Sequence, residues 1–160
     1  NEIVPLNIRY LQIITRPLPP LPPKYDGNDN QIEWAEYDSN GGLKIKAIFK
    51  YDDNGNRIRG DIYDSNGNFG SKYTFKYDSN DNQIERAEYD TNGNLKIKAI
   101  YKYDVNGNQT EKVRYDSNGI FGSKYTLKYE SDKQNNYIKR ITMRDGKASQ
   151  ITSREIEYYN

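Results

Sequence analysis

Residues 89–109 read YDTNGNLKIKAIYKYDVNGNQ, a strand-forming stretch between two copies of one turn signal. Apolar and lysine side chains alternate across its centre with the two-residue period of a β-strand, and Asn-Gly at either end favours a tight hairpin turn. The unit recurs along the chain at spacings that alternate between 12 and 14 residues. Its Tyr-Asp dipeptides begin at Tyr25, Tyr37, Tyr51, Tyr63, Tyr77, Tyr89, Tyr103 and Tyr115, and Tyr129-Glu130 is an altered ninth copy.

A longer repeat lies above this one, because residues 25–76 and 77–128 match in register at 38 of 52 positions. A fixed period of this kind indicates a repeat protein in which each unit is one supersecondary element. The expected fold is therefore all-β, an antiparallel meander of about ten strands in a single curved or twisted sheet, open or partly closed. Residues 1–24 form an apolar N-terminal segment plus a proline-rich linker, and residues 25–160 form the repeat domain.

The turns assign the strand residues to two faces. A two-residue type I′ turn at Asn40-Gly41 would pair three sets of residues across the hairpin, and paired residues share a face. The expected pairs are Asp38 with Leu43, Glu36 with Ile45 and Trp34 with Ala47. Carried through the later turns, this register predicts a buried apolar face. Its members are Ile32, Trp34, Leu43, Ile45, Ala47, Phe49, Tyr51, Ile58, Ile62, Phe69, Tyr73, Phe75, Tyr77, Ile84, Leu95, Ile97, Ala99, Tyr101, Tyr103, Phe121, Tyr125, Leu127 and Tyr129. The pattern weakens in the second copy, where Arg86, Lys112 and Arg114 replace Trp34, Gly60 and Ile62.

The opposite face, called the lysine face here, is expected to be exposed and basic. Its evenly spaced lysines, with tyrosines along one edge, suggest a surface for a glycan or another anionic polymer. The candidate binding residues are Lys44, Lys46, Lys72, Lys96, Lys98, Tyr37, Tyr63, Tyr89 and Tyr115. The competing interpretation is that these lysines are ordinary solvated strand residues that discourage edge aggregation.

Composition excludes several kinds of active site. The chain has no Cys and no His, so neither thiolate nor imidazole chemistry is available. Its acids are spread by the repeat rather than gathered as the paired carboxylates that hydrolysis requires. We therefore expect a protein that is not an enzyme, with no cofactor and no metal site. No apolar run is long enough to span a bilayer, and a net charge of +1 does not favour a nucleic-acid partner.

A single sheet must cover its apolar face. The sheet can curl, a second copy can stack on it as a homodimer, or the apolar residues 1–16 can lie across it as a lid or an extra strand. Between that segment and the sheet lies a proline-rich motif in which Arg16, Pro19 and Pro22 are spaced as in the ligands of SH3 domains. The alternative interpretation of residues 16–22 is a stiff spacer.

The Tyr-Asp-x-x-Gly pattern of residues 25–130 resembles the YD-repeat proteins, the bacterial family that includes the RHS proteins. The resemblance implies an exported β-repeat protein with a structural, encapsulating or carbohydrate-binding role. The chain begins at Asn1, which is consistent with removal of a leader. We expect a secreted, periplasmic or cell-surface module with a structural or protein-interaction role, and glycan binding and SH3 binding are the alternatives.

Overall fold

The chain forms one antiparallel meander, seen in a computed structural model that describes residues 22–134 and 136–158. Every strand pairs with its neighbours in sequence, and the described residues contain no helix. The strands are β1 (Lys24–Tyr25), β2 (Gln31–Tyr37), β3 (Leu43–Tyr51), β4 (Arg57–Tyr63), β5 (Phe69–Tyr77), β6 (Gln83–Tyr89), β7 (Leu95–Tyr103), β8 (Gln109–Tyr115), β9 (Phe121–Ser131), β10 (Tyr137–Arg144) and β11 (Lys147–Ser153). The predicted all-β meander is confirmed.

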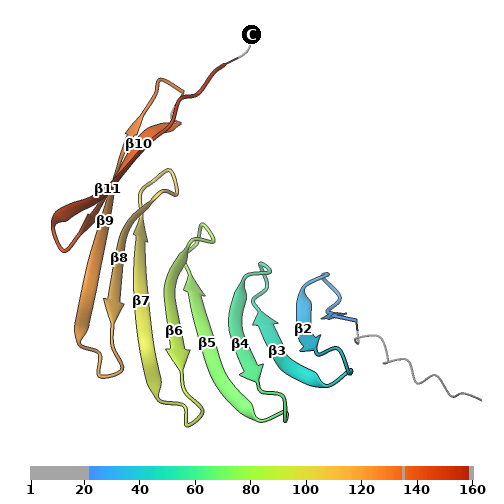
Figure 1. Cartoon of the computed structure of the whole chain (residues 1–160). Helices are drawn as coiled ribbons and strands as arrows, with labels where there is room; N and C mark the ends of the chain where they lie inside the picture. Colours follow the sequence, from blue (N-terminus) through green and yellow to red (C-terminus); the bar gives the residue numbers. More distant parts are fainter. Residues whose placement is uncertain (1–21, 135, 159–160) are drawn as a thin grey trace, which may run out of the picture.

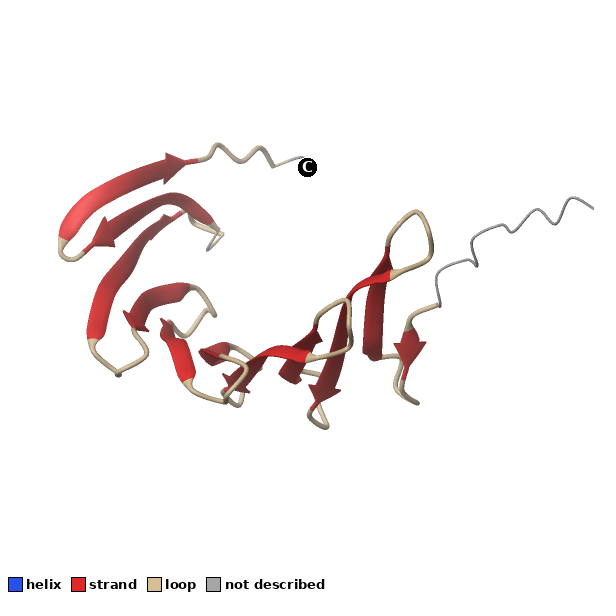
Figure 2. Cartoon of the chain, turned by 60° about the horizontal axis from the view of Figure 1, so that its bottom comes forward, coloured by secondary structure: helices blue, strands red, loops and turns tan. Residues whose placement is uncertain are grey.

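The sheet is a single open layer. Figure 1 shows the strands side by side in chain order, and Figure 2 shows the layer curving along its length. β1 and β11 are the two edges and do not pair with each other, so the sheet is not closed.

The Tyr-Asp turns are three-residue loops rather than the type I′ turns predicted from Asn-Gly. In the first of the Asn-Gly turns, Gly41 N–H donates to the Asp38 carbonyl at 3.1 Å, and Asp38 N–H donates to the Gly42 carbonyl at 2.8 Å. Gly41 has φ +83°, whereas Asn40 keeps a negative φ. This is a type I turn followed by a left-handed glycine. The prediction was wrong because the Asp38 carboxylate accepts hydrogen bonds from the backbone of Asn40 and Gly42, each at 2.8 Å, and so organises a longer loop.

A two-residue turn with positive φ at both positions does occur, at Asp145 (φ +48°) and Gly146 (φ +83°) between β10 and β11. The Asp-Gly dipeptide is a strong sequence signal for this turn. Asp29 and Asp81 have φ values of +61° and +60° at the loop position that glycine occupies in the other Tyr-Asp turns. The Asp81 carboxylate also accepts hydrogen bonds from the side chains of Asn54 (3.1 Å) and Asn56 (2.6 Å), which ties two neighbouring turns together.

The tyrosine of every second Tyr-Asp pair holds adjacent strands together. The Tyr103 hydroxyl of β7 donates to the carbonyl of Gln83, the first residue of β6, at 2.9 Å. Tyr51, Tyr77 and Tyr129 make the corresponding bonds to Gln31, Arg57 and Gln109, at 2.9, 3.0 and 2.8 Å. In the repeat, the tyrosine hydroxyl therefore links neighbouring strands, and the aspartate carboxylate stabilises the turn.

The register matches the prediction in the strand centres and departs from it near the turns. Trp34 pairs with Ala47 and Glu36 with Ile45, as expected, but Leu43 pairs with Tyr37 instead of Asp38. A β-bulge causes the shift by adding one residue, Lys44, to β3. Similar shifts occur at the other Tyr-Asp hairpins. The extra residues include Ile32, Ile58 and Ile84, which the simple alternation had placed on the apolar face.

The bulges also turn the first residue of a long strand toward the lysine face. The Phe69 ring makes an edge contact with Tyr63 at a centroid distance of 6.0 Å. Leu95 lines a hollow with Lys98 and Tyr115. Their equivalents, Leu43 and Phe121, pair with Tyr37 and Tyr115, so the assignment of these four residues to the apolar face was wrong.

Burial is shallow because residues 22–134 and 136–158 form a single sheet and supply no second layer. Among the described residues, the buried apolar side chains are Ala47, Ala87 and Ala99, and no large side chain is fully buried. Ile45, Phe49, Phe75, Ile97 and Leu127 share the apolar face as predicted but are half-buried rather than largely buried. The lysine face also has a buried apolar side chain, because Ala87 lies on it.

Candidate ligand site on the apolar face

An aromatic hollow of ≈ 340 Å³ opens on the apolar face between β2 and β6, and we call it the Trp34 hollow. Its lining residues are Trp34, Ala47, Phe49, Arg57, Gly60, Ile62, Tyr73, Phe75 and Arg86. Trp34 is 37% exposed, so part of the indole ring remains available for contact. Apolar concave surfaces with a few polar groups at the rim are the usual setting for ligand binding.

The hollow exists because one row of the sheet lacks a side chain. Gly60 lies between Phe49 of β3 and Tyr73 of β5, and a Cβ there would stand 3.4 Å from the Phe49 ring. Two guanidinium groups stack at the rim. Arg57 lies 4.2 Å from the centre of the Phe49 ring, and Arg86 lies 5.0 Å from that of Tyr73. Such stacking stabilises a cation beside an apolar surface, and Arg86 also lies 3.9 Å from the Glu88 carboxylate.

The internal duplication shows that this region diverged more than the rest of the repeat. The two 52-residue blocks match at 38 positions and therefore differ at 14. Eight residues of the Trp34 hollow have a counterpart in the second block, and six of these eight differ. The changed residues are Trp34, Phe49, Arg57, Gly60, Ile62 and Phe75, whose counterparts are Arg86, Tyr101, Gln109, Lys112, Arg114 and Leu127. Differences that gather at one place on a shared scaffold point to a specialised surface rather than to packing. That concentration is a sequence signal by which the Trp34 hollow could have been found.

The predicted lysine-face site is a network of ion pairs. Glu85 of β6 lies between Lys76 of β5 at 3.1 Å and Lys98 of β7 at 2.8 Å. Glu33 is paired in the same way with Lys24 and Lys46, and Glu111 with Lys102 and Lys124. Hydrogen bonds from Lys24 and Lys46 lower the pKa of Glu33, and those from Lys124 and Lys102 lower that of Glu111. Lys46 and Lys98 are consequently half-buried rather than exposed as predicted.

The other candidate lysines, Lys44, Lys72 and Lys96, lie outside these three groups of one glutamate and two lysines. Lys44 and Lys96, displaced by the bulges, pair with Glu36 and Glu88, and the Lys96 ammonium lies 2.7 Å from Glu88. Both glutamates lie opposite isoleucines of the apolar face, so these two lysines do not join the lysine-face row. Lys72 stands 4.2 Å from the centre of the Tyr89 ring.

The four candidate tyrosines are the last residues of β2, β4, β6 and β8, so they lie along the side of the sheet where these four strands end. They are Tyr37, Tyr63, Tyr89 and Tyr115. All four are half-buried. Pro22 of the SH3-like motif is exposed, and Arg16 and Pro19 lie outside the described residues. Binding by the lysine face and by the proline motif both stay predictions.

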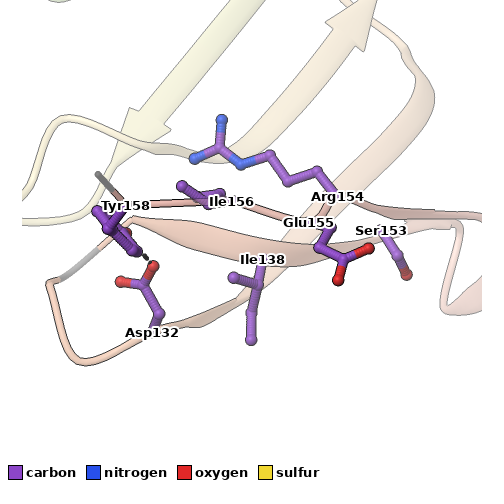
Figure 3. Close-up of a pocket in the computed structure, with 7 residues that line it drawn as sticks. All are labelled: Asp132, Ile138, Ser153, Arg154, Glu155, Ile156 and Tyr158. Atoms are coloured by element: carbon purple, nitrogen blue, oxygen red, sulfur yellow. Dashed lines mark hydrogen bonds between the residues drawn. The ribbon is translucent and has the colours of Figure 1, made fainter. Parts of the chain in front are cut away.

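A second, larger hollow of ≈ 550 Å³ lies beside the segment that follows β11 (Figure 3). Two of its polar lining residues, Asp132 and Tyr158, bind each other. The Tyr158 hydroxyl donates to the Asp132 carboxylate, which lowers the pKa of Asp132 and raises the pKa of Tyr158. Arg154 donates to the Tyr137 carbonyl and stacks 3.8 Å from the centre of the Tyr137 ring. In Figure 3 the Arg154 and Glu155 side chains point away from each other. These contacts fasten the end of the chain to the β9–β10 hairpin.

Residues 22–134 and 136–158 contain no group of three or more acidic side chains arranged to hold a metal ion. They also contain no helix that is long and apolar enough to cross a membrane.

Comparisons with known proteins leave the family open. No protein-family model matches the chain, and no curated protein matches its sequence. A Bacteroides fragilis protein of unknown function aligns with a TM-score of 0.47 and 15% identity, over 73% of this chain and 96% of its own. The Tc holotoxin pore of Photorhabdus luminescens aligns with a TM-score of 0.29 and 13% identity, over 82% of this chain and 9% of that chain. A functional proposal must therefore rest on the geometry of the chain itself.

Proposed function

We propose that this chain is a non-enzymatic β-repeat module that binds a glycan in the Trp34 hollow. The observation that carries the proposal is an aromatic hollow with stacked arginines on a sheet face that none of the described residues covers with a second layer. Aromatic rings offer large rigid contact surfaces at little entropic cost, and the apolar faces of sugar rings can stack on them. Guanidinium groups at the rim supply directional hydrogen-bond donors for hydroxyl or carboxylate groups.

We also propose that the module is of the YD-repeat type and acts outside the bacterial cytoplasm. The repeated role of Tyr-Asp supports the first part, because tyrosine links strands and aspartate builds turns through most of the sheet. A structural or protein-interaction role remains the main competitor, and the experiment below separates it from glycan binding.

Trp34 is the single tryptophan of the chain, so its fluorescence reports directly on the Trp34 hollow. We expect a saturable change in Trp34 emission on titration with cellohexaose, oligogalacturonate or its methyl ester. Gly60→Lys should abolish the response, because it fills the hollow with the side chain that the second block carries as Lys112. Gly60 has no positive φ, so the backbone accepts a side chain.

Phe121→Ala is the matched control, since Phe121 is an exposed aromatic residue far along the sheet at β9. It should leave the titration unchanged. No fluorescence change with any of the three glycans would overturn glycan binding in the Trp34 hollow. Retention of these glycans with unchanged Trp34 emission would favour the lysine face instead.

A further inference from the structure

The second block carries three cations where the first block has the Trp34 hollow. Arg86, Lys112 and Arg114 are the counterparts of Trp34, Gly60 and Ile62. Cross-strand pairing places Arg86 of β6 and Arg114 of β8 on either side of Ala99 of β7. Ala99 itself is buried, only 6% exposed. Lys112 lies in the next row, paired with Tyr101 and Tyr125.

These cations have little acidic compensation among the described strand residues. Within the described strands β6–β8, Glu88 is the sole carboxylate on the apolar face, and Lys96 holds it at 2.7 Å. Arg86 is only loosely associated with that carboxylate, at 3.9 Å. The other face of β8 is different, because Glu111 there lies between Lys102 and Lys124. On the lysine face of β8 a carboxylate balances the nearby lysines, whereas the cations on the apolar face of β8 have no such carboxylate on the described strand.

The positive charges of Arg86 and Arg114 act on the ammonium group of Lys112. Burial lowers the pKa of Lys112, and the positive charges of Arg114 and Arg86 lower it further. Its ammonium group lies 5.6 Å from the centre of the Tyr101 ring, and Arg144 lies 5.7 Å from that of Tyr125. The apolar face therefore alternates cations with aromatic rings beyond the hollow as well as in it. A bound anion would offset this like-charge repulsion.

We propose that Arg86, Lys112 and Arg114 form an anion-binding cradle that continues the Trp34 hollow and selects an acidic polysaccharide, one that carries uronate carboxylates. The inference rests on the proposed glycan-binding function and names the class of glycan. Phe75 of the hollow, Arg86, Ala99 and Arg114 are successive members of one cross-strand row. The row spans about 14 Å, three strand spacings of about 4.8 Å. An extended chain can therefore stack on the hollow and place carboxylates over the cradle.

Charge complementarity favours this ligand over the other ways of covering the face. A second copy would bring the same cations against the cradle. Residues 1–16 carry Arg9 and Arg16 and a single acid, Glu2, so they do not supply the missing negative charge. An acidic peptide has the charge, but a peptide that adds to a sheet does so through an exposed edge, whereas the cradle lies on a face.

The test compares oligogalacturonate with its methyl ester, which has the same rings without the charge. The full chain should bind the acid form about tenfold or more tightly, as expected for charge-assisted hydrogen bonds. Lys112→Gln combined with Arg114→Gln should reduce binding of the acid to the level of the ester, with Trp34 emission as the readout. Lys50→Gln combined with Lys128→Gln removes the same charge from exposed lysines of the other face and should leave the preference intact.

Each outcome separates the cradle from the hollow. Equal binding of acid and ester, or a preference that survives in the cradle variant, overturns the cradle and leaves glycan binding standing. Binding of neither form, together with no response to cellohexaose, overturns both proposals. Polyglutamate that competes as well as oligogalacturonate overturns the polysaccharide assignment in favour of an acidic peptide. Concentration-dependent dimerisation that the cradle variant strengthens would identify a second copy as the occupant and also overturn the proposal.

Discussion

Replacement of Gly107 by Val tests the turn geometry that repeats along the sheet. Gly107 has φ +77°, and the nearest atom that an added Cβ would meet is Asn82 Oδ1 at 3.7 Å, an ordinary contact. The cost of the substitution is therefore backbone strain rather than a clash. A left-handed conformation costs an L-residue about 1–2 kcal/mol, and β-branching adds to it. The loss of unfolded-state entropy offsets about 0.4–1 kcal/mol for a Gly→Ala change at an unstrained site.

We therefore expect Gly107→Val to destabilise the protein by about 1–3 kcal/mol, the range for a residue held in a disfavoured backbone region. Thermal unfolding followed by circular dichroism measures it, because each kcal/mol lowers Tm by about 2–4 °C in a chain of this size. Gly107→Asp is the matched control, since Asp81 occupies the same loop position with φ +60°. Asp should cost less than Val. Equal Tm values for the parent and the Val and Asp variants would refute a left-handed residue at this position.

Three further predictions concern the links between strands. Tyr103→Phe removes the 2.9 Å hydrogen bond to the Gln83 carbonyl and should lower the free energy of unfolding in urea by about 0.5–1.5 kcal/mol. Tyr101→Phe should be neutral, because the first block has Phe49 at the equivalent position. An equal loss in both variants would contradict the strand-linking role of Tyr103. Glu85→Gln should cost about 1 kcal/mol, as expected for ion pairs that are partly exposed, and the loss should shrink in high salt. A loss independent of salt would count against the ion pairs. Lysine partners lower the pKa of Glu33 and Glu111 from the ordinary value of 4.5, so the unfolded chain binds protons at higher pH than the folded one. The stability from these pairs should be complete above about pH 5 and should disappear as the pH falls through the lowered pKa values. A Tm that does not change between neutral and acidic pH would refute this contribution.

The repeat, the strands and the pairing at the strand centres followed from the sequence. Alternation in stretches such as residues 95–103 and the fixed Tyr-Asp spacing are local signals, and an antiparallel meander pairs each strand with its sequence neighbour. Trp34 therefore lies opposite Ala47 as the turn positions predicted. The Asp-Gly dipeptide at Asp145-Gly146 is a local signal of the same kind, and a two-residue turn forms there.

The turn type and the bulges were decided by contacts beyond the dipeptide. The Asp38 side chain bonds to the backbone two and four residues later, and this longer loop adds a bulge that moves Leu43 and Lys44 out of alternation. A one-residue change of this kind reverses which face a side chain occupies. The ion pairs of the lysine face were also decided by the tertiary structure. Glu85 contacts Lys76 and Lys98 only because β5, β6 and β7 lie side by side.

The Trp34 hollow combines both kinds of information. Sequence alone showed that Trp34, Gly60 and Ile62 become Arg86, Lys112 and Arg114 in the second block. Only the assembled sheet showed that these positions are neighbours, because Gly60 pairs with Phe49 and Tyr73 across three strands. A hollow is the absence of side-chain volume between residues far apart in the chain. Periodicity determines which way a residue points, and packing between strands decides what space is left beside it.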